Sequence, residues 1–190
     1  MIQILTALIL THPPVPHFED VSVDLLAVTI GTEQPAVDDM SEDLAIAIYR
    51  ASQAYDISPY FLAGVIRTES NFKPWVKGDC KDGRCKAKGL GQLHMIAARG
   101  RKSEITPCEA QGRCNEAALV CKRRHTMQCQ RAIETNTLTT AWLIAKLRRK
   151  YGKRAMVIYN CGGRCGRSLW TNTVRKYFRH YRRFKFVKAL

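Results

Sequence analysis

The chain has 190 residues, a formal net charge of +15 and 46% hydrophobic residues. This length suits one compact domain with a single core plus a terminal extension, and it argues against an array of several domains. The charge is uneven, because residues 1–43 contain eight acids and no Lys or Arg, whereas the rest of the chain contains eight acids and 31 bases. Such asymmetry predicts a polyanionic partner, which could be nucleic acid, anionic lipid or an anionic cell envelope; the alternative is a solvated basic surface without a particular partner.

The N-terminal segment, residues 1–40, is acidic and interrupted by proline. Residues 2–10 are apolar, but they are too short to span a bilayer and no basic residue precedes them. We interpret them as a weak export signal or pro-segment and expect no transmembrane segment. Four of the seven prolines lie within residues 11–40. We therefore predict an irregular, loosely ordered N-terminal arm, either solvated or lying across the basic body.

Residues 41–190 have the pattern of a mainly α-helical single domain. Apolar residues at helical spacing predict a first helix over about 40–55. A second helix over about 58–70 begins at Ser58, a residue type that caps helices, followed by Pro59, which suits the first helical position.

The Gly, Asp, Lys and Cys content of residues 71–91 predicts a long loop, followed by a shorter helix. Residues 101–130 are rich in cysteine and poorly patterned, so we predict only irregular or short helical structure there. Further helices are predicted over about 136–151, 153–160 and 171 to the end. We find no convincing run of alternating strand residues and no internal repeat.

Eight cysteines form a cysteine-rich loop region within the basic body. They are Cys80, Cys85, Cys108, Cys114, Cys121, Cys129, Cys161 and Cys165. An even count favours disulfides, and hence export or release into an oxidising environment. A zinc site is the alternative, although no two cysteines have the CxxC spacing of zinc knuckles. The sequence does not determine the pairing, and no motif requires a metal or an organic cofactor.

Glu69 is the first candidate for chemistry. It follows Val65 by four residues and Leu62 by seven, so the second helix places its carboxylate on the apolar face. Burial there disfavours the charged form and raises the pKa of a carboxyl, as a general acid requires near neutral pH. On position alone, the favoured interpretation is a structural glutamate at a fraying helix end that reaches water.

Three sequence blocks change this balance. They are Glu69 to Pro74 (ESNFKP), Ala87 to Leu93 (AKGLGQL) and Ala155 to Gly162 (AMVIYNCG). In this order, and with a helix led by Asn136 between the last two, they resemble the lysozyme-like domain of the soluble lytic transglycosylases, which is related to goose-type lysozyme. The resemblance covers about residues 41–185 and implies a lysozyme-like single catalytic domain.

The resemblance implies cleavage of the β-1,4 bond between N-acetylmuramic acid and N-acetylglucosamine in peptidoglycan. Glu69 would be the sole catalytic residue, first as general acid on the glycosidic oxygen and then as base toward the muramic acid C6 hydroxyl, leaving a 1,6-anhydro end. Gln92, Tyr159 and Asn160 would bind substrate. Ser70, next to the acid, suits either a substrate contact or a helix-end hydrogen bond.

The chain also departs from the family pattern. Gly91 stands where the family usually has Met before Gln92, and the family's C-terminal tyrosine fits two registers, so that Tyr177 is not assigned to it. Asp79 and Asp82 lie in an added loop, and goose-type lysozymes use extra aspartates to position a water molecule. A muramidase that hydrolyses the bond with the help of Asp79 or Asp82 is therefore the alternative.

For a wall enzyme we expect peptidoglycan glycan strands and anionic cell-envelope polymers as partners, and a monomer that is secreted, periplasmic or associated with a phage particle. The tail at 175–188 interleaves basic and aromatic residues, as nucleic-acid-binding modules do. We disfavour nucleic acid, because the wall is also polyanionic and the same aromatics fit the core-facing side of a terminal helix. A wall-binding protein without activity is a third reading.

Overall fold

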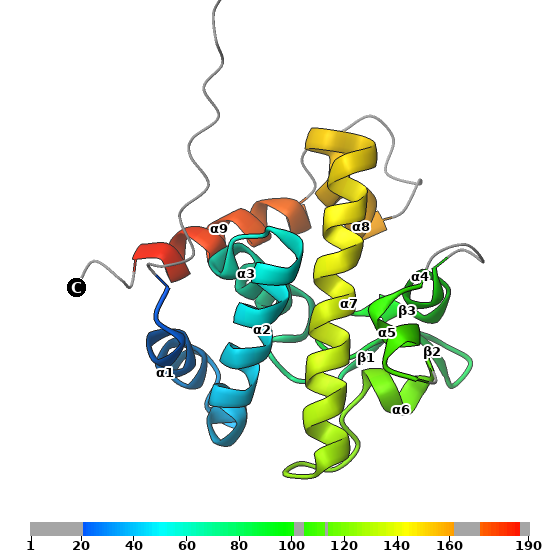
Figure 1. The fold of residues 1–190 in the computed structure, drawn as a ribbon, viewed down its shortest axis with the longest axis horizontal. Coiled ribbons are helices and arrows are strands. Elements are labelled where there is room, and N and C mark those ends of the chain that lie inside the picture. Colours follow the sequence, from blue (N-terminus) through cyan, green and yellow to red (C-terminus); the bar gives the residue numbers. More distant parts are fainter. Residues whose placement is uncertain (1–20, 101–104, 113, 162–171, 187–190) are drawn as a thin grey trace, which may run out of the picture.

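The computed structural model describes residues 21–100, 105–112, 114–161 and 172–186 (Figure 1). These residues are mainly helical, which confirms the predicted fold class. The predictions for the apolar start and for Cys165 fall outside the described residues.

The described N-terminal segment is helical, which differs from the predicted loosely ordered arm. Helix α1 (Val23–Glu33) is followed by the 3-10 helix η2 (Pro35–Met40). Leu26 and Ile30 of α1 are buried in the main hydrophobic core. Pro35 occupies the start of η2, where its fixed φ favours a helical turn instead of breaking one. The other three prolines of this segment precede residue 21.

The next two predicted helices are confirmed. They are α2 (Ser41–Tyr55) and α3 (Pro59–Ser70). Each ends at a residue in the left-handed conformation, Asp56 with φ 51° and Asn71 with φ 55°, which stops the helical hydrogen bonding. Their apolar faces supply much of the core through Leu44, Ala45, Ile48, Ala51, Leu62, Ala63, Val65 and Ile66.

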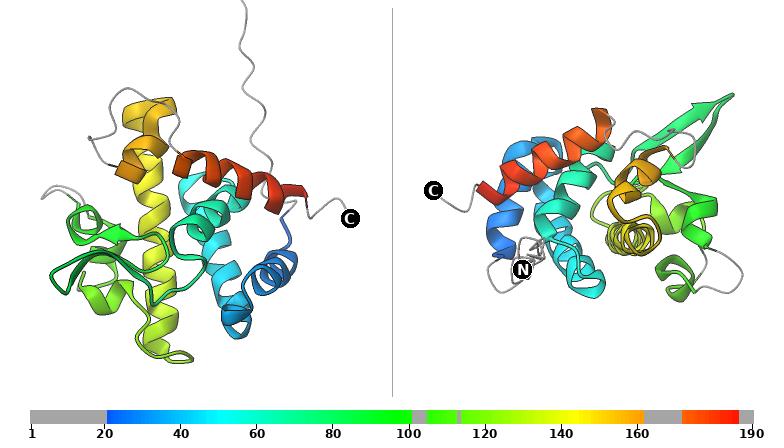
Figure 2. Two further views of the ribbon diagram at one scale, coloured as in Figure 1. Left: turned by 180° about the vertical axis from the view of Figure 1, so that it is seen from behind. Right: turned by 90° about the horizontal axis from the view of Figure 1, so that it is seen from above.

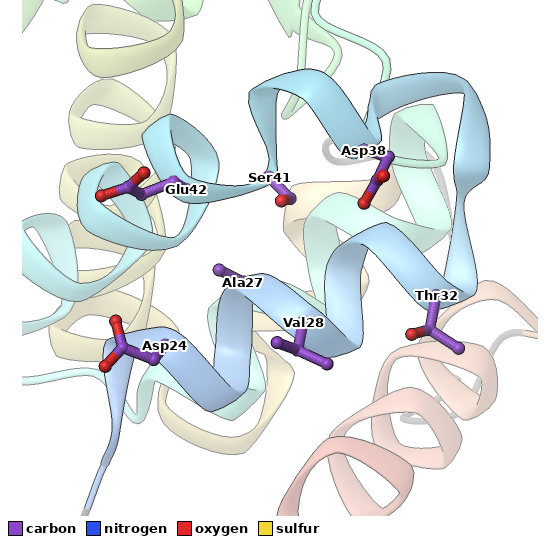
Figure 3. Close-up of a pocket in the computed structure, with 7 residues that line it drawn as sticks. All are labelled: Asp24, Ala27, Val28, Thr32, Asp38, Ser41 and Glu42. Carbon is purple, nitrogen blue, oxygen red and sulfur yellow. The ribbon is translucent and has the colours of Figure 1, made fainter.

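A pocket of about 460 Å³ lies between α1 and the segment from η2 to the start of α2 (Figure 3). Three of its lining side chains are acidic, so the pocket is negatively charged. The lining residues are Asp24, Ala27, Val28, Thr32, Asp38, Ser41 and Glu42. None of the site residues predicted from the sequence belongs to this lining.

The predicted long loop at 71–91 contains most of a small antiparallel sheet, so the expectation of no strands is wrong. Strands β1 (Lys77–Lys81), β2 (Arg84–Lys88) and β3 (Leu93–His94) pair in the order β1-β2-β3. The turn at Asp82-Gly83 has positive φ at both residues, 49° and 73°, which is typical of a two-residue hairpin turn. The strands are short, basic and mostly exposed, and therefore lack an alternating apolar pattern.

Beyond the sheet lie three short helices and a second, smaller core. The helices are α4 (Met95–Arg99), α5 (Pro107–Ala110) and α6 (Glu116–Leu119). The core consists of Leu93, Ala98, Cys108, Leu119 and Val120. This agrees with the prediction of irregular or short helical structure over 101–130 where that range is described.

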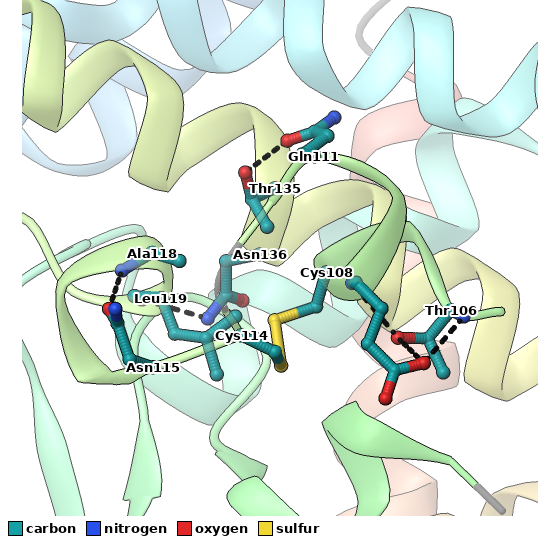
Figure 4. Close-up of a disulfide and its surroundings, with 10 residues drawn as sticks. Thr106, Cys108, Gln111, Cys114, Asn115, Ala118, Leu119, Thr135 and Asn136 are labelled. Atoms are coloured by element: carbon teal, nitrogen blue, oxygen red, sulfur yellow. Dashed lines mark hydrogen bonds between the residues drawn. A yellow bond between two sulfur atoms is a disulfide. The ribbon is translucent and has the colours of Figure 1, made fainter. Parts of the chain in front are cut away.

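Disulfides rather than a zinc site hold this part of the chain together, which confirms the disulfide prediction. The bridges are Cys80–Cys85, Cys108–Cys114 and Cys121–Cys129. Cys80 and Cys85 face each other across the β1–β2 hairpin. Cys108–Cys114 joins α5 to the segment before α6, beside Asn136 and Leu119 (Figure 4). Cys161 is disulfide-bonded as well.

Helix α7 (Met127–Tyr151) begins nine residues before the predicted start at 136, because Thr126 caps it by accepting a hydrogen bond from Cys129 N at 3.1 Å. The 3-10 helix η3 (Gly152–Arg154) and helix α8 (Ala155–Cys161) follow, in agreement with the predicted helix over 153–160. Helix α9 (Asn172–Phe186) is the predicted basic C-terminal helix.

The long helix α7 divides the molecule into two parts. Figure 1 and Figure 2 show α1, α2, α3 and α9 on one side of α7, and the sheet with α4, α5 and α6 on the other. We call the second part the small lobe. Within the described residues, no helix combines the length and apolar character needed to cross a membrane.

Candidate active site

Glu69 lies in the last turn of α3, with its side chain half-buried. Burial raises the pKa of its carboxyl above the ordinary value. A hydrogen bond from Tyr177 opposes this shift, and the negative charge of Asp79 adds to it. The net direction is upward, so Glu69 keeps its proton to higher pH than an exposed glutamate does.

Tyr177 of α9 is the hydrogen-bond donor to Glu69. Its hydroxyl donates to Glu69 Oε1, and its side chain is fully buried in the main core. The side chain of Asn160, from α8, hydrogen-bonds to the same hydroxyl. Burial raises the pKa of Tyr177, and the charge of Glu69 raises it further, so the phenol remains a proton donor. Side chains from α3, α8 and α9 thus meet at the Tyr177 hydroxyl.

Close contact between α3 and α9 places Tyr177 within reach of Glu69. A Cβ atom on Gly64 of α3 would lie 2.8 Å from Tyr181 N and 2.9 Å from Tyr177 O, closer than ordinary van der Waals contact. The absence of a side chain at Gly64 therefore lets the two backbones approach. Aromatic contacts stabilise the crossing, with the ring of Phe61 5.5 Å from that of Phe178.

Tyr159 of α8 also interacts electrostatically with Glu69. Its hydroxyl donates to Gly91 O at 2.6 Å. Burial raises the pKa of Tyr159 well above the ordinary value, and the charge of Glu69 raises it further, which shows that the two side chains interact. A Cβ atom on Gly91 would collide with Thr140 Oγ1 and would lie 2.9 Å from Tyr159 Oη. Gly91, which departs from the family's usual Met, is thus enclosed by side chains.

Asn136 of α7 fixes the glycine-rich segment beside these tyrosines. Its Oδ1 accepts a hydrogen bond from Gly91 N at 2.8 Å, and its Nδ2 donates to Lys88 O and Leu119 O, both at 3.0 Å. The side chain is 1% exposed, so all three bonds are shielded from water. Asn136 therefore joins the helical part of the molecule to the small lobe (Figure 4).

Gln92 and Ser70 both make internal hydrogen bonds. Gln92 has a left-handed φ of 48°, and its Nε2 donates to Gly89 O at 2.8 Å and to Val76 O at 3.3 Å. Ser70 is buried, and its hydroxyl donates to Ile66 O at 3.1 Å. In the substrate-free protein, Gln92 thus stabilises the loop before β3. Ser70 makes a helix-end hydrogen bond, which was one of its two expected roles.

Asp79 and Asp82 occupy different environments. The Oδ2 atom of Asp79 lies 2.7 Å from His94 Nε2, which links β1 to β3, and its charge acts on Glu69. Asp79 has a left-handed φ of 51°. Asp82 is exposed in the hairpin turn, where an aspartate tolerates the positive φ that the turn requires. The structure thus brings Asp79, but not Asp82, into electrostatic contact with Glu69.

Two residues of the site, Gly64 and His94, were not recognised from the sequence. A third, Tyr177, was not assigned to the family's C-terminal tyrosine. Gly64 could have been found from its place beside Ala63 on the core-facing side of a short helix, since small residues permit close helix packing. His94 carries no local signal, because its partner lies 15 residues away in another strand.

No group of three or more His, Cys, Asp or Glu side chains suited to a metal ion occurs among the described residues. The groups gathered around Glu69 are its own carboxyl, of raised pKa, the phenols of Tyr159 and Tyr177, and the side-chain amides of Asn160 and Gln92.

Comparison with known proteins identifies the family. The family described as Transglycosylase SLT domain matches residues 46–181, from within α2 to within α9. Searches of curated proteins and of solved structures found no match. Because the family match spans well over half of the chain and includes Glu69, Gln92, Tyr159 and Tyr177, the chain belongs to the Transglycosylase SLT domain family and is a lytic transglycosylase that acts on peptidoglycan.

Proposed function

We propose that Glu69 carries out both proton transfers in cleavage of the bond between N-acetylmuramic acid and N-acetylglucosamine. The single observation that supports this most is the environment of its carboxyl, which is half-buried, raised in pKa and hydrogen-bonded by Tyr177. A raised pKa keeps the acid protonated where an ordinary glutamate is ionised, and the hydrogen bond orients it.

The two proton transfers together consume no water molecule. Protonated Glu69 donates its proton to the glycosidic oxygen as the bond from muramic acid C1 to that oxygen breaks, through an oxocarbenium-like transition state. The resulting carboxylate then accepts the proton of the muramic acid C6 hydroxyl, whose oxygen bonds to C1. The products are a free N-acetylglucosamine 4-hydroxyl and a 1,6-anhydro-muramic acid end, and Glu69 is protonated again.

The neighbouring groups stabilise the charged states of this cycle. The Tyr177 hydroxyl donates to Glu69 and so favours its carboxylate form after the first step. Asn160 supports Tyr177 and, being exposed, is also placed to contact sugar. Tyr159 and Gln92 hold the Gly89 to Gly91 backbone, and we assign both to the shape of the substrate site. Ser70 we assign to the end of α3.

Hydrolysis is the second candidate, and Asp79 is the observation that favours it. A carboxylate that His94 holds within electrostatic reach of Glu69 is suited to position a water molecule. Asp82 has no comparable contact, and we retain only Asp79 for this role.

The test is digestion of purified peptidoglycan followed by mass spectrometry of the fragments. Transglycosylation predicts anhydro-ended fragments and hydrolysis predicts reducing ends; release of neither by the wild type would contradict both. Glu69→Gln should abolish release while keeping a folded chain. If Glu69 works alone, Asp79→Asn should still release fragments with anhydro ends, whereas selective loss of reducing ends would favour the hydrolase.

We further propose that the protein works outside a reducing cytoplasm, as a secreted, periplasmic or particle-associated monomer. The disulfides support this, because such bridges persist in oxidising surroundings. Non-reducing mass analysis of the protein recovered from its native setting tests it: free thiols at the cysteines of these three bridges would contradict the assignment.

A further inference from the structure

Helix α9 presents two opposite faces. Its inward face contacts α3 and the main core through Val174, Tyr177 and Phe184. Its outward face has exposed arginines at 175, 179 and 182. This spacing of four and then three residues places the three guanidinium groups in one row, over about 10 Å of helix at 1.5 Å per residue. We call Arg175, Arg179 and Arg182 the arginine row.

The charge of the arginine row is not offset by acidic residues of α9 itself. No acid follows Glu134 in the sequence, so α9 has none of its own. Glu33 of α1 pairs with Arg183, at 2.5 Å, and with Arg67. Among the described residues, no acidic side chain forms an ion pair with any member of the arginine row.

The arginine row makes only a small contribution to the pKa of its neighbour His180. Burial lowers that pKa most and Arg67 of α3 lowers it further; Glu33 raises it, and Arg183 and Arg179 lower it by smaller amounts. Like charges three and four residues apart destabilise a helix, so the arginine row carries a folding cost. An anionic partner would remove that cost.

The aromatic side chains of α9 indicate which kind of polyanion fits. Tyr177 and Phe184 are buried, and Phe178 and Tyr181 are packed against the core. Phe184 meets Phe72 edge to face, with ring centroids 5.8 Å apart. Tyr177 and Phe184 therefore cannot stack on bases, and the partly buried rings of Phe178 and Tyr181 are held against the core, whereas single-stranded nucleic acid binding requires exposed rings. What the outward face offers is a row of planar cations suited to phosphate oxygens.

We propose that the arginine row binds the phosphate groups of anionic polymers attached to peptidoglycan. This rests on the proposed action on the cell wall, since it is the wall that brings such polymers to the enzyme. The row lies on the face of α9 opposite Tyr177, so the polymer is held outside the catalytic site. Binding there retains the enzyme on its insoluble substrate between cleavage events.

The test compares two variants that lose the same net charge. The first is Arg175→Gln, Arg179→Gln and Arg182→Gln, which removes the row and keeps good helix formers. The second is Arg123→Gln, Arg131→Gln and Arg149→Gln, which removes three exposed arginines from the loop before α7 and from α7 itself. Both are made in the full chain.

Binding is measured by co-sedimentation with intact sacculi and with sacculi stripped of phosphate polymers by hydrofluoric acid. The Glu69→Gln background prevents digestion during the assay. We expect the row variant to bind intact sacculi at least about tenfold more weakly at 0.1 M salt, and the control variant to lose less than about threefold. Stripped sacculi should bind both variants and the parent alike.

Three results would overturn the proposal. In the first, the two variants lose affinity for intact sacculi equally. In the second, the parent binds intact and stripped sacculi equally well. In the third, the row variant loses affinity for duplex DNA but keeps its affinity for sacculi. Cleavage of short soluble glycan fragments, measured with Glu69 intact, separates this proposal from the catalytic one. The row variant should retain that activity. If instead the proposed catalytic function is wrong, neither the wild type nor any variant would cleave the fragments.

Discussion

Gly64→Ala tests whether the approach of α9 to α3 is what places Tyr177 on the Glu69 carboxyl. The new Cβ would lie 2.8 Å from Tyr181 N. Restoring a contact of about 3.5 Å requires α9 to move by roughly 0.7 Å. Overpacking of this kind costs about 1–3 kcal/mol, whereas replacing Gly by Ala inside a helix returns about 1 kcal/mol. We expect a net destabilisation of roughly 0–2 kcal/mol.

The effect on catalysis should exceed the effect on stability. Hydrogen bonds to charged groups contribute about 1.5–3 kcal/mol, so full loss of the bond from Tyr177 to Glu69 would lower kcat roughly tenfold to 150-fold. Urea denaturation and initial rates of anhydro-product release measure the two quantities. In a double-mutant cycle, adding Gly64→Ala to Tyr177→Phe should cost little further activity. Unchanged kcat in the single Gly64→Ala variant, or additive losses in the cycle, would refute the reasoning.

Three further predictions concern the same site. Glu69→Gln should raise the free energy of unfolding relative to wild type as pH rises above about 4.3, because the raised pKa makes ionisation of Glu69 costly in the folded state. The gain should reach about 1.4 kcal/mol for each unit by which the folded pKa of Glu69 exceeds its unfolded pKa. A variant no more stable than wild type at pH 8 would contradict this. Asp79→Asn should move the alkaline limb of the kcat profile to lower pH, because the charge of Asp79 raises the pKa of Glu69; a shift to higher pH would exclude that coupling. Asn136→Ala leaves three buried backbone groups without partners and should cost about 3 kcal/mol or more in urea denaturation, whereas a loss below about 1 kcal/mol would show that water replaces the amide.

The helices of the main core could be predicted from the sequence because their signals are local. The Ser58-Pro59 start and the apolar spacing after it predicted the second helix within a residue or so of Pro59–Ser70. The sheet could not be recognised in this way, because β1 and β2 contain mainly Lys, Arg and Cys and leave most side chains in water. Only the Asp82-Gly83 turn signalled the hairpin.

The candidate site was predictable in the parts that short motifs encode. Glu69, Gln92 and Tyr159 each lie in a sequence block that resembles the family. Tyr177 lies 108 residues after Glu69, and its role depends on how α9 crosses α3. No local pattern determines that crossing; it follows from Gly64 and from aromatic packing. The contact between Asp79 and His94 could not be predicted from the sequence for the same reason, since it requires the pairing of three strands.

The small lobe relies on covalent cross-links more than on burial. Its core has five buried residues, one of them a bridged cysteine, whereas most of the buried residues belong to the helical part. Bridges between cysteines 5 and 6 residues apart lie within the lobe, and a bridge between cysteines 8 residues apart joins the segment after α6 to α7; each closes a short loop, worth about 2 kcal/mol. In reducing surroundings, therefore, we expect the helical part to fold while the lobe carrying Asp79 and His94 loosens, so that oxidation acts as the last step of maturation.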